Sequence, residues 1–307
     1  GLKCLLVILA GLYVHRYGDP AARPVVALHG IRGHGGRWRH LAERHLRDSY
    51  VVAPDLRGHG RSDGTPPWSV ERHVDDVLGV LDELGLDRVD VIGHSFGGLI
   101  ALYLTRTAPH RVARLALLDP SVGLDPHGVR ENAHRSLVVP SFADQVQARS
   151  EREAAWPYAS PEVLDDDVAE HLAQGSDGRW RWRFEAAAVV TAYSDMARPA
   201  LVPTVPTLLL IGQRAGFVRP EFVADCRAAL GADLTVAELD CGHMLYLERP
   251  DEVGGLLRPF LTGNRSMQSP PHNGGDVAAH RTTFVMAEAG RAHTRTSPRS
   301  TTSPHGT

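Results

Sequence analysis

The chain has 307 residues, a hydrophobic share of 43%, a charged share of 22% and a formal net charge of −3. These values are ordinary for a globular protein and allow one large α/β domain or two small ones. They disfavour a nucleic-acid partner, which would require a clustered basic face. The cysteines Cys4, Cys226 and Cys241 are odd in number and form no CxxC pair, which argues against a disulfide framework and a zinc site. A reducing compartment fits this cysteine usage best, so we expect a cytoplasmic protein.

Residues 4–10 form a strongly apolar run that follows Lys3. The run is too short for a membrane span, which needs roughly 20 apolar residues. Its length favours a buried first strand. The alternative is the remnant of a secretory signal or anchor, because the chain begins at Gly1 rather than Met and its true N-terminus is in question.

From residue 12 to about residue 119, short β-branched runs alternate with amphipathic stretches. Such alternation predicts an α/β fold with a mostly parallel sheet covered by helices on both faces. The predicted strands are Leu12–Arg16, Pro24–Leu28, Tyr50–Ala53, Asp90–Ile92 and Leu115–Leu118. The predicted helices are Ser69–Leu84 and Ser95–Ala108.

The pentapeptide at 93–97, Gly-His-Ser-Phe-Gly, fits the pattern of a serine held on a sharp strand-to-helix turn. A β-branched run precedes it and an apolar, helix-like run follows it, which is the context that this pattern requires. Such a turn places its serine at unfavourable backbone angles, so the neighbouring glycines serve close packing. We therefore expect Ser95 to be a nucleophile.

Residues 120–203 interrupt the alternation and contain no strand-like run. They predict several short helices, and most of the large aromatic side chains of this segment are expected to pack it onto the core, with the rest lining a pocket. An insertion of this size between two sheet strands predicts a cap over the carboxyl edge of the sheet. The α/β pattern then resumes as the strand Thr207–Ile211, the helix Pro220–Leu230, the strand Leu234–Leu239 and the helix Pro250–Leu261.

The sequence thus predicts a core made of residues 1–119 and 204–262, a helical cap over 120–203, and a tail over 263–307. The tail is rich in Ser, Thr, Pro, Gly, His and Arg, and we expect it to be disordered because it has too few large apolar residues to fold.

A serine hydroxyl needs an adjacent base, and a stabiliser for the oxyanion that its attack creates. His243 lies between the last predicted strand and the last helix and is the expected base. The expected oxyanion donors are the backbone amides of Phe96, which follows the nucleophile, and Ile31, in a glycine-rich loop after an early strand. His29 is expected to tether that loop rather than act on substrate.

Four motifs at characteristic spacing make the chain resemble the α/β-hydrolase-fold family, in its small capped esterase, lipase and peptidase branch. They are Leu28-His29-Gly30, Asp55–Ser62, Gly93–Gly98, and Gly242-His243 followed by Glu248-Arg249-Pro250. The resemblance covers residues 12 to about 262 and implies an eight-stranded type of sheet with the helical cap inserted before the last strands. It also implies that Asp55–Ser62 is a structural loop.

The family usually carries its catalytic acid just after the strand that corresponds to Thr207–Ile211, but residues 212–220 contain no Asp or Glu. A minority of members places the acid one strand earlier, and there Asp119 directly follows Leu115–Leu118. We expect Asp119 to be the acid. Glu221, Asp225 and Asp125 remain alternatives, as does a serine–histidine dyad without an acid.

These observations predict a serine hydrolase that cleaves an ester or related acyl bond of a small, partly apolar molecule through an acyl-enzyme. The scheme requires no metal or organic cofactor. Other serine-dependent activities of the same fold stay open: C–C bond hydrolases, thioesterases, lactonases, amidases and cofactor-free haloperoxidases. The missing acid after Ile211 also keeps open a non-catalytic ligand-binding protein.

Overall fold

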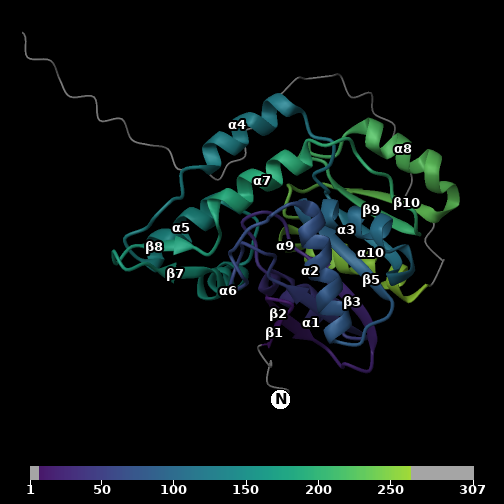
Figure 1. The fold of residues 1–307 in the computed structure, drawn as a ribbon, viewed down its shortest axis with the longest axis horizontal. Coiled ribbons are helices and arrows are strands. Elements are labelled where there is room, and N and C mark those ends of the chain that lie inside the picture. The colour runs from purple at the N-terminus through teal and green to yellow at the C-terminus, as the bar shows by residue number, and fades with distance from the viewer. Residues whose placement is uncertain (1–6, 264–307) are drawn as a thin grey trace, which may run out of the picture.

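The computed structural model describes residues 7–263, and an eight-stranded sheet forms its centre (Figure 1). The strands are β1 (Val7–Leu9), β2 (Leu12–Tyr17), β3 (Arg23–Leu28), β4 (Ser49–Pro54), β5 (Val89–His94), β6 (Val112–Leu118), β7 (Leu172–Gln174), β8 (Trp180–Trp182), β9 (Thr207–Gly212) and β10 (Leu234–Leu239). The α-helices are α1 (Arg39–His45), α2 (Val70–Glu83), α3 (Phe96–Thr107), α4 (Pro126–Ser136), α5 (Gln145–Ala155), α6 (Pro161–His171), α7 (Ala186–Met196), α8 (Pro220–Leu230), α9 (Leu245–Glu248) and α10 (Pro250–Thr262).

The strand order β1-β2-β4-β3-β5-β6-β9-β10 confirms the mostly parallel sheet. The pairs from β4 through β10 are parallel, and only β1 and β2 pair antiparallel with their neighbours. Parallel strands place all their carboxyl ends on one edge. The residues that follow β5, β6, β9 and β10 therefore meet at that edge.

Both faces of the sheet are covered, as the alternating pattern predicts. Along β3, Val26 and Leu28 face a core cluster that includes apolar residues of α2, α3 and α8, whereas Val25 and Ala27 face a second cluster with α1 and α10. The period-two alternation of a strand thus serves two separate cores. Most side chains of β4 and β5 are apolar, and every residue of these two central strands is buried.

The predicted core elements are present with boundaries shifted by no more than about three residues, which is the usual uncertainty of element ends. The first strand is only partly as expected. Val7–Leu9 does form β1, but it lies at the edge of the sheet and Ile8 is 58% exposed. The prediction of a buried strand is wrong there because β1 has a neighbour on one side only. Residues 4–6, and the tail from residue 264, lie outside the described residues.

We call residues 120–203 the inserted segment; it connects β6 to β9 and contains helices α4 to α7. Figure 1 shows α4, α5 and α7 lying to one side of the sheet. The expectation of helices alone is wrong, because β7 and β8 pair as an antiparallel hairpin. Its turn is closed by Asp177, which accepts from the Arg179 amide at 3.1 Å, and by Gly178, whose φ of 75° suits glycine. No helix within residues 7–263 is long and apolar enough to cross a membrane.

Candidate active site

Ser95 occupies the sharp turn between β5 and α3. Its φ of 54° and ψ of −120° are strained for a residue with a side chain, at a cost of about 1 to 3 kcal/mol. The flanking glycines make this turn possible, since a Cβ on Gly93 would lie 2.5 Å from the Gly97 carbonyl oxygen. The Ser95 amide donates to the Leu118 carbonyl at 3.1 Å, which anchors the turn to the end of β6. The strand, turn and helix thus hold the serine at the carboxyl edge of the sheet.

Asp119 lies directly after β6 at the same edge and is fully buried. It too adopts a left-handed backbone conformation, with φ of 44°. Its amide donates to the Leu210 carbonyl at 2.8 Å, and its Oδ1 accepts from the Gly212 amide at 3.1 Å. The carboxylate therefore reaches the end of β9, the strand after which the resemblance would place the acid.

His243 follows β10 and completes the contact. Its Nδ1 donates to Asp119 Oδ2 over 2.6 Å, which leaves Nε2 of the neutral ring as the acceptor that a general base needs. The loop is held by His94 Nε2, which donates to the His243 carbonyl at 2.8 Å, and by Glu248, which accepts from the Gly242 amide at 2.8 Å. The His243 ring also packs against Phe217, with ring centroids 4.2 Å apart.

The alternative acids lie elsewhere. Glu221 is in α8, where it faces Arg219 at 3.6 Å, and its side chain is 73% exposed. Asp225 is also on α8, and Asp125 caps the amino end of α4 by accepting from the Gly128 amide. Among the described residues, Asp119 is the carboxylate bonded to the His243 ring.

Ser121 is a neighbour of Ser95 that the sequence analysis missed. Its Oγ lies 3.0 Å from Ser95 Oγ, and its amide donates to the Ser95 carbonyl at 3.2 Å. Among the described residues, this is the hydrogen bond that Ser95 Oγ makes, and none joins it to His243. The sequence signal that could have indicated it is its position, two residues after Asp119, the candidate acid at the end of a predicted strand.

The glycine-rich loop after β3 lies against Ser95. A Cβ on Gly30 would lie 2.9 Å from Ser95 Cβ, so only glycine allows this approach. Within residues 7–263, no hydrogen-bond acceptor is found for the amides of Ile31 and Phe96. Phe96 directly follows the serine in the chain, and Ile31 directly follows Gly30, whose backbone approaches Ser95.

His29 tethers this loop, as the sequence analysis expects. Its Nδ1 donates to the Gly30 carbonyl at 2.7 Å, and its Nε2 accepts from the Leu56 amide at 2.9 Å. Burial holds the pKa of His29 well below its ordinary value, with a further lowering from His59, so the ring is neutral. The loop Asp55–Ser62 is likewise structural in its contacts, because Asp55 accepts from the Gly35 and Arg61 amides.

Two buried clusters combine histidines and a carboxylate with ligand-like spacing: His15, His34 and Asp55, and His34, Asp167 and His171. Arg37 and Arg152 lie against Asp167, with Nε atoms 2.8 and 3.0 Å from its oxygens. These guanidiniums already balance the carboxylate, so the second cluster suits a structural role better than a cation. In the first cluster, Asp55 oxygens are engaged by His15 and backbone amides.

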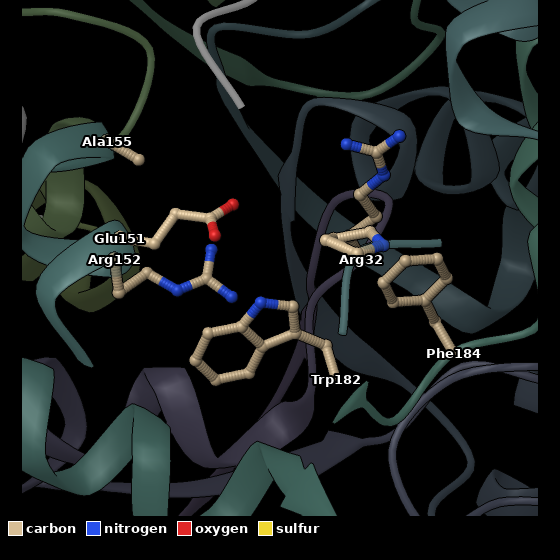
Figure 2. Close-up of a pocket in the computed structure, with 7 residues that line it drawn as sticks. Arg32, Glu151, Arg152, Ala155, Trp182 and Phe184 are labelled. Atoms are coloured by element: carbon tan, nitrogen blue, oxygen red, sulfur yellow. The ribbon is translucent and has the colours of Figure 1, made fainter. Parts of the chain in front are cut away.

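A pocket lies where the inserted segment meets the loop after β3. Figure 2 shows Arg32, Trp182 and Phe184 around a common hollow, with Glu151, Arg152 and Ala155 on its other side. Arg32 directly follows Ile31, and its guanidinium donates to Ser136 Oγ of α4 at 2.8 Å. The pocket therefore combines aromatic walls with charged groups beside the candidate oxyanion loop.

Comparison with known proteins agrees with this architecture. Residues 25–255 match the model of the alpha/beta hydrolase family. Lipase LipV of Mycobacterium tuberculosis is 39% identical over 260 residues, covering 83% of this chain and 99% of that protein. A putative carbamate hydrolase, RutD of Rhizobium rhizogenes, is 34% identical over 260 residues, covering 81% of this chain and 96% of its own length.

Among solved structures, E-2-(acetamidomethylene)succinate hydrolase superposes with a TM-score of 0.74 over 82% of this chain and 95% of its own, at 20% identity, which bears on the fold alone. The relatives named lipase and esterase support hydrolase activity on esters. The sheet order, the matched residues and the identity to LipV together show that this chain belongs to the alpha/beta hydrolase family.

Proposed function

We propose that this protein is a serine hydrolase that cleaves carboxylic esters of small, partly apolar molecules through an acyl-enzyme. Ser95 is the nucleophile, His243 the general base and Asp119 the acid that orients it. The observation that carries the proposal is the 2.6 Å bond between His243 Nδ1 and Asp119 Oδ2, made at the sheet edge where Ser95 occupies its strained turn. A histidine with Nδ1 bonded in this way presents Nε2 to a serine hydroxyl.

The reaction follows from these positions. Ser95 Oγ bonds to the ester carbonyl carbon while its proton passes to His243 Nε2, and the carbonyl electron pair moves onto oxygen. The Ile31 and Phe96 amides donate to that oxyanion. The intermediate collapses by breaking the bond to the leaving alcohol oxygen, which takes the proton from His243. Water then repeats the sequence on the acyl-enzyme, with His243 accepting its proton and returning it to Ser95.

The residues that the inserted segment contributes to the pocket fit a small, partly apolar substrate. We propose that residues 120–203 cap the site and that the hollow between Phe184, Trp182 and Arg32 receives part of the substrate. Its aromatic walls favour an apolar group, while Arg32 and Glu151 favour a polar end. The contact between Asp119 and His243 weighs against the non-catalytic binder that the missing acid after Ile211 keeps open.

Labelling with a fluorophosphonate probe tests the proposal. We expect the wild-type protein to be labelled once, and Ser95→Ala to be unlabelled. His243→Ala should label at a small fraction of the wild-type rate, because the hydroxyl then lacks its base. Turnover of p-nitrophenyl acetate and butyrate should follow the same order. Labelling that persists in Ser95→Ala would contradict the proposal.

A second candidate is hydrolysis of an acyl C–N bond. Its support is the 34% identity to a relative named as a putative carbamate hydrolase. The same residues would act, with His243 protonating a leaving nitrogen. Assaying the ester and the amide of the same acid separates the two: turnover of the amide at a rate comparable to that of the ester would favour this candidate, and amide turnover at the uncatalysed rate would exclude it.

A further inference from the structure

Ser121 contacts the nucleophile itself rather than the surrounding scaffold. The two hydroxyl oxygens lie 3.0 Å apart, and Ser95 and Ser121 are only 3% and 2% exposed. Each hydroxyl has one proton to donate and can accept as well. In a site so shielded from water, the direction of this bond affects the charge that develops on Ser95 Oγ.

The position of Ser121 is set by the backbone on both sides of it. Asp119 turns the chain through its left-handed conformation, and Pro120 then packs so closely on α3 that a Cβ on Gly98 would lie 2.8 Å from Pro120 Cβ. The Ser121 amide donates to the Ser95 carbonyl at 3.2 Å. The hydroxyl is therefore held beside the nucleophile before any substrate arrives.

The tripeptide 119–121 thus contacts both His243 and Ser95. Asp119 bonds the ring of His243, and Ser121 bonds the hydroxyl of Ser95. During attack the Ser95 proton must move to His243, so Ser95 has no proton left for Ser121. At that moment Ser121 can only be the donor of the bond between them.

We propose that Ser121 is a positioning residue whose hydroxyl donates to Ser95 Oγ as that oxygen loses its proton. This inference rests on the proposed serine mechanism and deepens it. The bond strengthens as negative charge develops on Ser95 Oγ, during attack and again when the acyl-enzyme releases it as the leaving oxygen. The Ser121 proton stays on Ser121 throughout, so the balance of the reaction is unchanged.

Paired variants at this position test the donor role. Ser121→Thr keeps the hydroxyl, whereas Ser121→Val introduces a side chain of nearly the same shape as threonine but without the hydroxyl. We expect kcat for p-nitrophenyl butyrate to fall about 10- to 100-fold in Ser121→Val and Ser121→Ala, the usual worth of a hydrogen bond to a charged group. KM should change little, fluorophosphonate labelling should slow in parallel, and Ser121→Thr should keep most of the activity. Thr105→Val, which removes a buried hydroxyl bonded within α3, is the control and should leave kcat unchanged.

Equal kcat in Ser121→Thr and Ser121→Val would overturn the donor role, and so would a rise in kcat in Ser121→Ala, which would identify a restraining contact instead. If the branched variants do not fold, Ser121→Ala decides alone: a native melting temperature with unchanged kcat would refute the inference. Wild-type labelling at Ser95 keeps this result separate from the proposed function. If Ser95 is not labelled, the mechanism fails; if it is labelled and the Ser121 variants are fully active, only the inference fails.

Discussion

Asp119 and Asp167 are two of the buried aspartates that pair with histidines in this protein, and comparing them shows that the same residue pair can serve different ends. Asp119 accepts from His243 at the sheet edge, while Asp167 accepts from His34 at 2.9 Å where α6 of the inserted segment meets the core. Both carboxylates are at least 98% buried, since their exposed fractions are 0% and 2%. Burial and a histidine partner therefore do not by themselves identify a catalytic acid.

The two sites differ in their charge. Asp167 faces the guanidiniums of Arg37 and Arg152 as well as His34. Burial raises the pKa of the Asp167 carboxyl, but these three neighbours outweigh it and hold the pKa well below its ordinary value. Asp119 instead accepts hydrogen bonds from one backbone amide, that of Gly212, and from one histidine, His243.

The two histidines also differ in their surroundings. The His243 side chain is 19% exposed and lies on the loop after β10, whereas the His34 side chain is 3% exposed and stacks on His171 with centroids 4.9 Å apart. A base needs a path to substrate, and a structural contact needs none. Partial exposure of the histidine thus distinguishes the candidate active site from the Asp167 junction, by which we mean the contacts of Asp167 with His34, Arg37 and Arg152.

Replacing Asp119 should produce the largest effect on activity. We expect Asp119→Asn to lower kcat about 10,000-fold, because an amide favours the wrong histidine tautomer. The melting temperature should change little, since the amide can still accept from Gly212. Turnover of p-nitrophenyl acetate at saturation measures this, and an unchanged kcat would remove Asp119 from the mechanism.

Replacing Asp167 should damage stability instead of chemistry. Asp167→Asn removes the negative charge that faces two buried guanidiniums, so we expect the free energy of unfolding to fall by about 3 kcal/mol. Urea denaturation measures this loss, and kcat of the folded fraction should stay within about tenfold of wild type. Asp165→Asn on the exposed face of the same helix is the control. If Asp167→Asn matched this control in stability, the contacts of Asp167 with His34, Arg37 and Arg152 would not stabilise the protein.

Buried neutral histidines should make the protein lose stability below neutral pH. Burial lowers the pKa of His59 to about 4 and that of His73 to about 3, with Arg57 and His59 lowering His73 further. The unfolded chain therefore binds more protons between the unfolded and folded pKa values, and stability falls as pH falls through that window. From pH 7.5 to pH 5, each such histidine should cost about 2 kcal/mol of unfolding free energy.

Urea denaturation at the two pH values tests this prediction. His73 is a suitable probe because it packs edge-on against Phe96, with ring centroids 5.3 Å apart, and its two ring nitrogens lack hydrogen-bond partners among the described residues. His73→Leu should lose less stability on acidification than the wild type. An identical loss in both proteins would exclude His73 as a source of the pH dependence.

The smallest effect should come from the rejected acid. Glu221→Gln should change kcat/KM by no more than about twofold, because substitutions on an exposed face away from special contacts have small effects. Its side chain is 73% exposed on α8. A loss comparable to that of Asp119→Asn would mean that α8 moves its carboxylate to His243 during turnover.

Local patterns were enough to predict most of the fold and two residues of the site. Strand and helix periods predicted the core elements, and the glycine pattern around Ser95 predicted the turn, because sterics at a strand-to-helix turn act within a few residues. The position of His243 followed from chain order. The hairpin β7–β8 was missed because its three-residue strands are too short to show a period.

The sequence by itself determined the strained serine, the sheet that carries it and a histidine at the same edge. Only the tertiary structure decided which carboxylate reaches that histidine, because the local pattern placed Asp119 at a strand end but could not give the distance from Asp119, Glu221, Asp225 or Asp125 to His243. β6 lies beside β9, so Asp119 bonds Gly212 and His243 across the sheet edge. Ser121 and the Asp167 junction were hidden for the same reason, since their contacts join positions 26 and 130 residues apart.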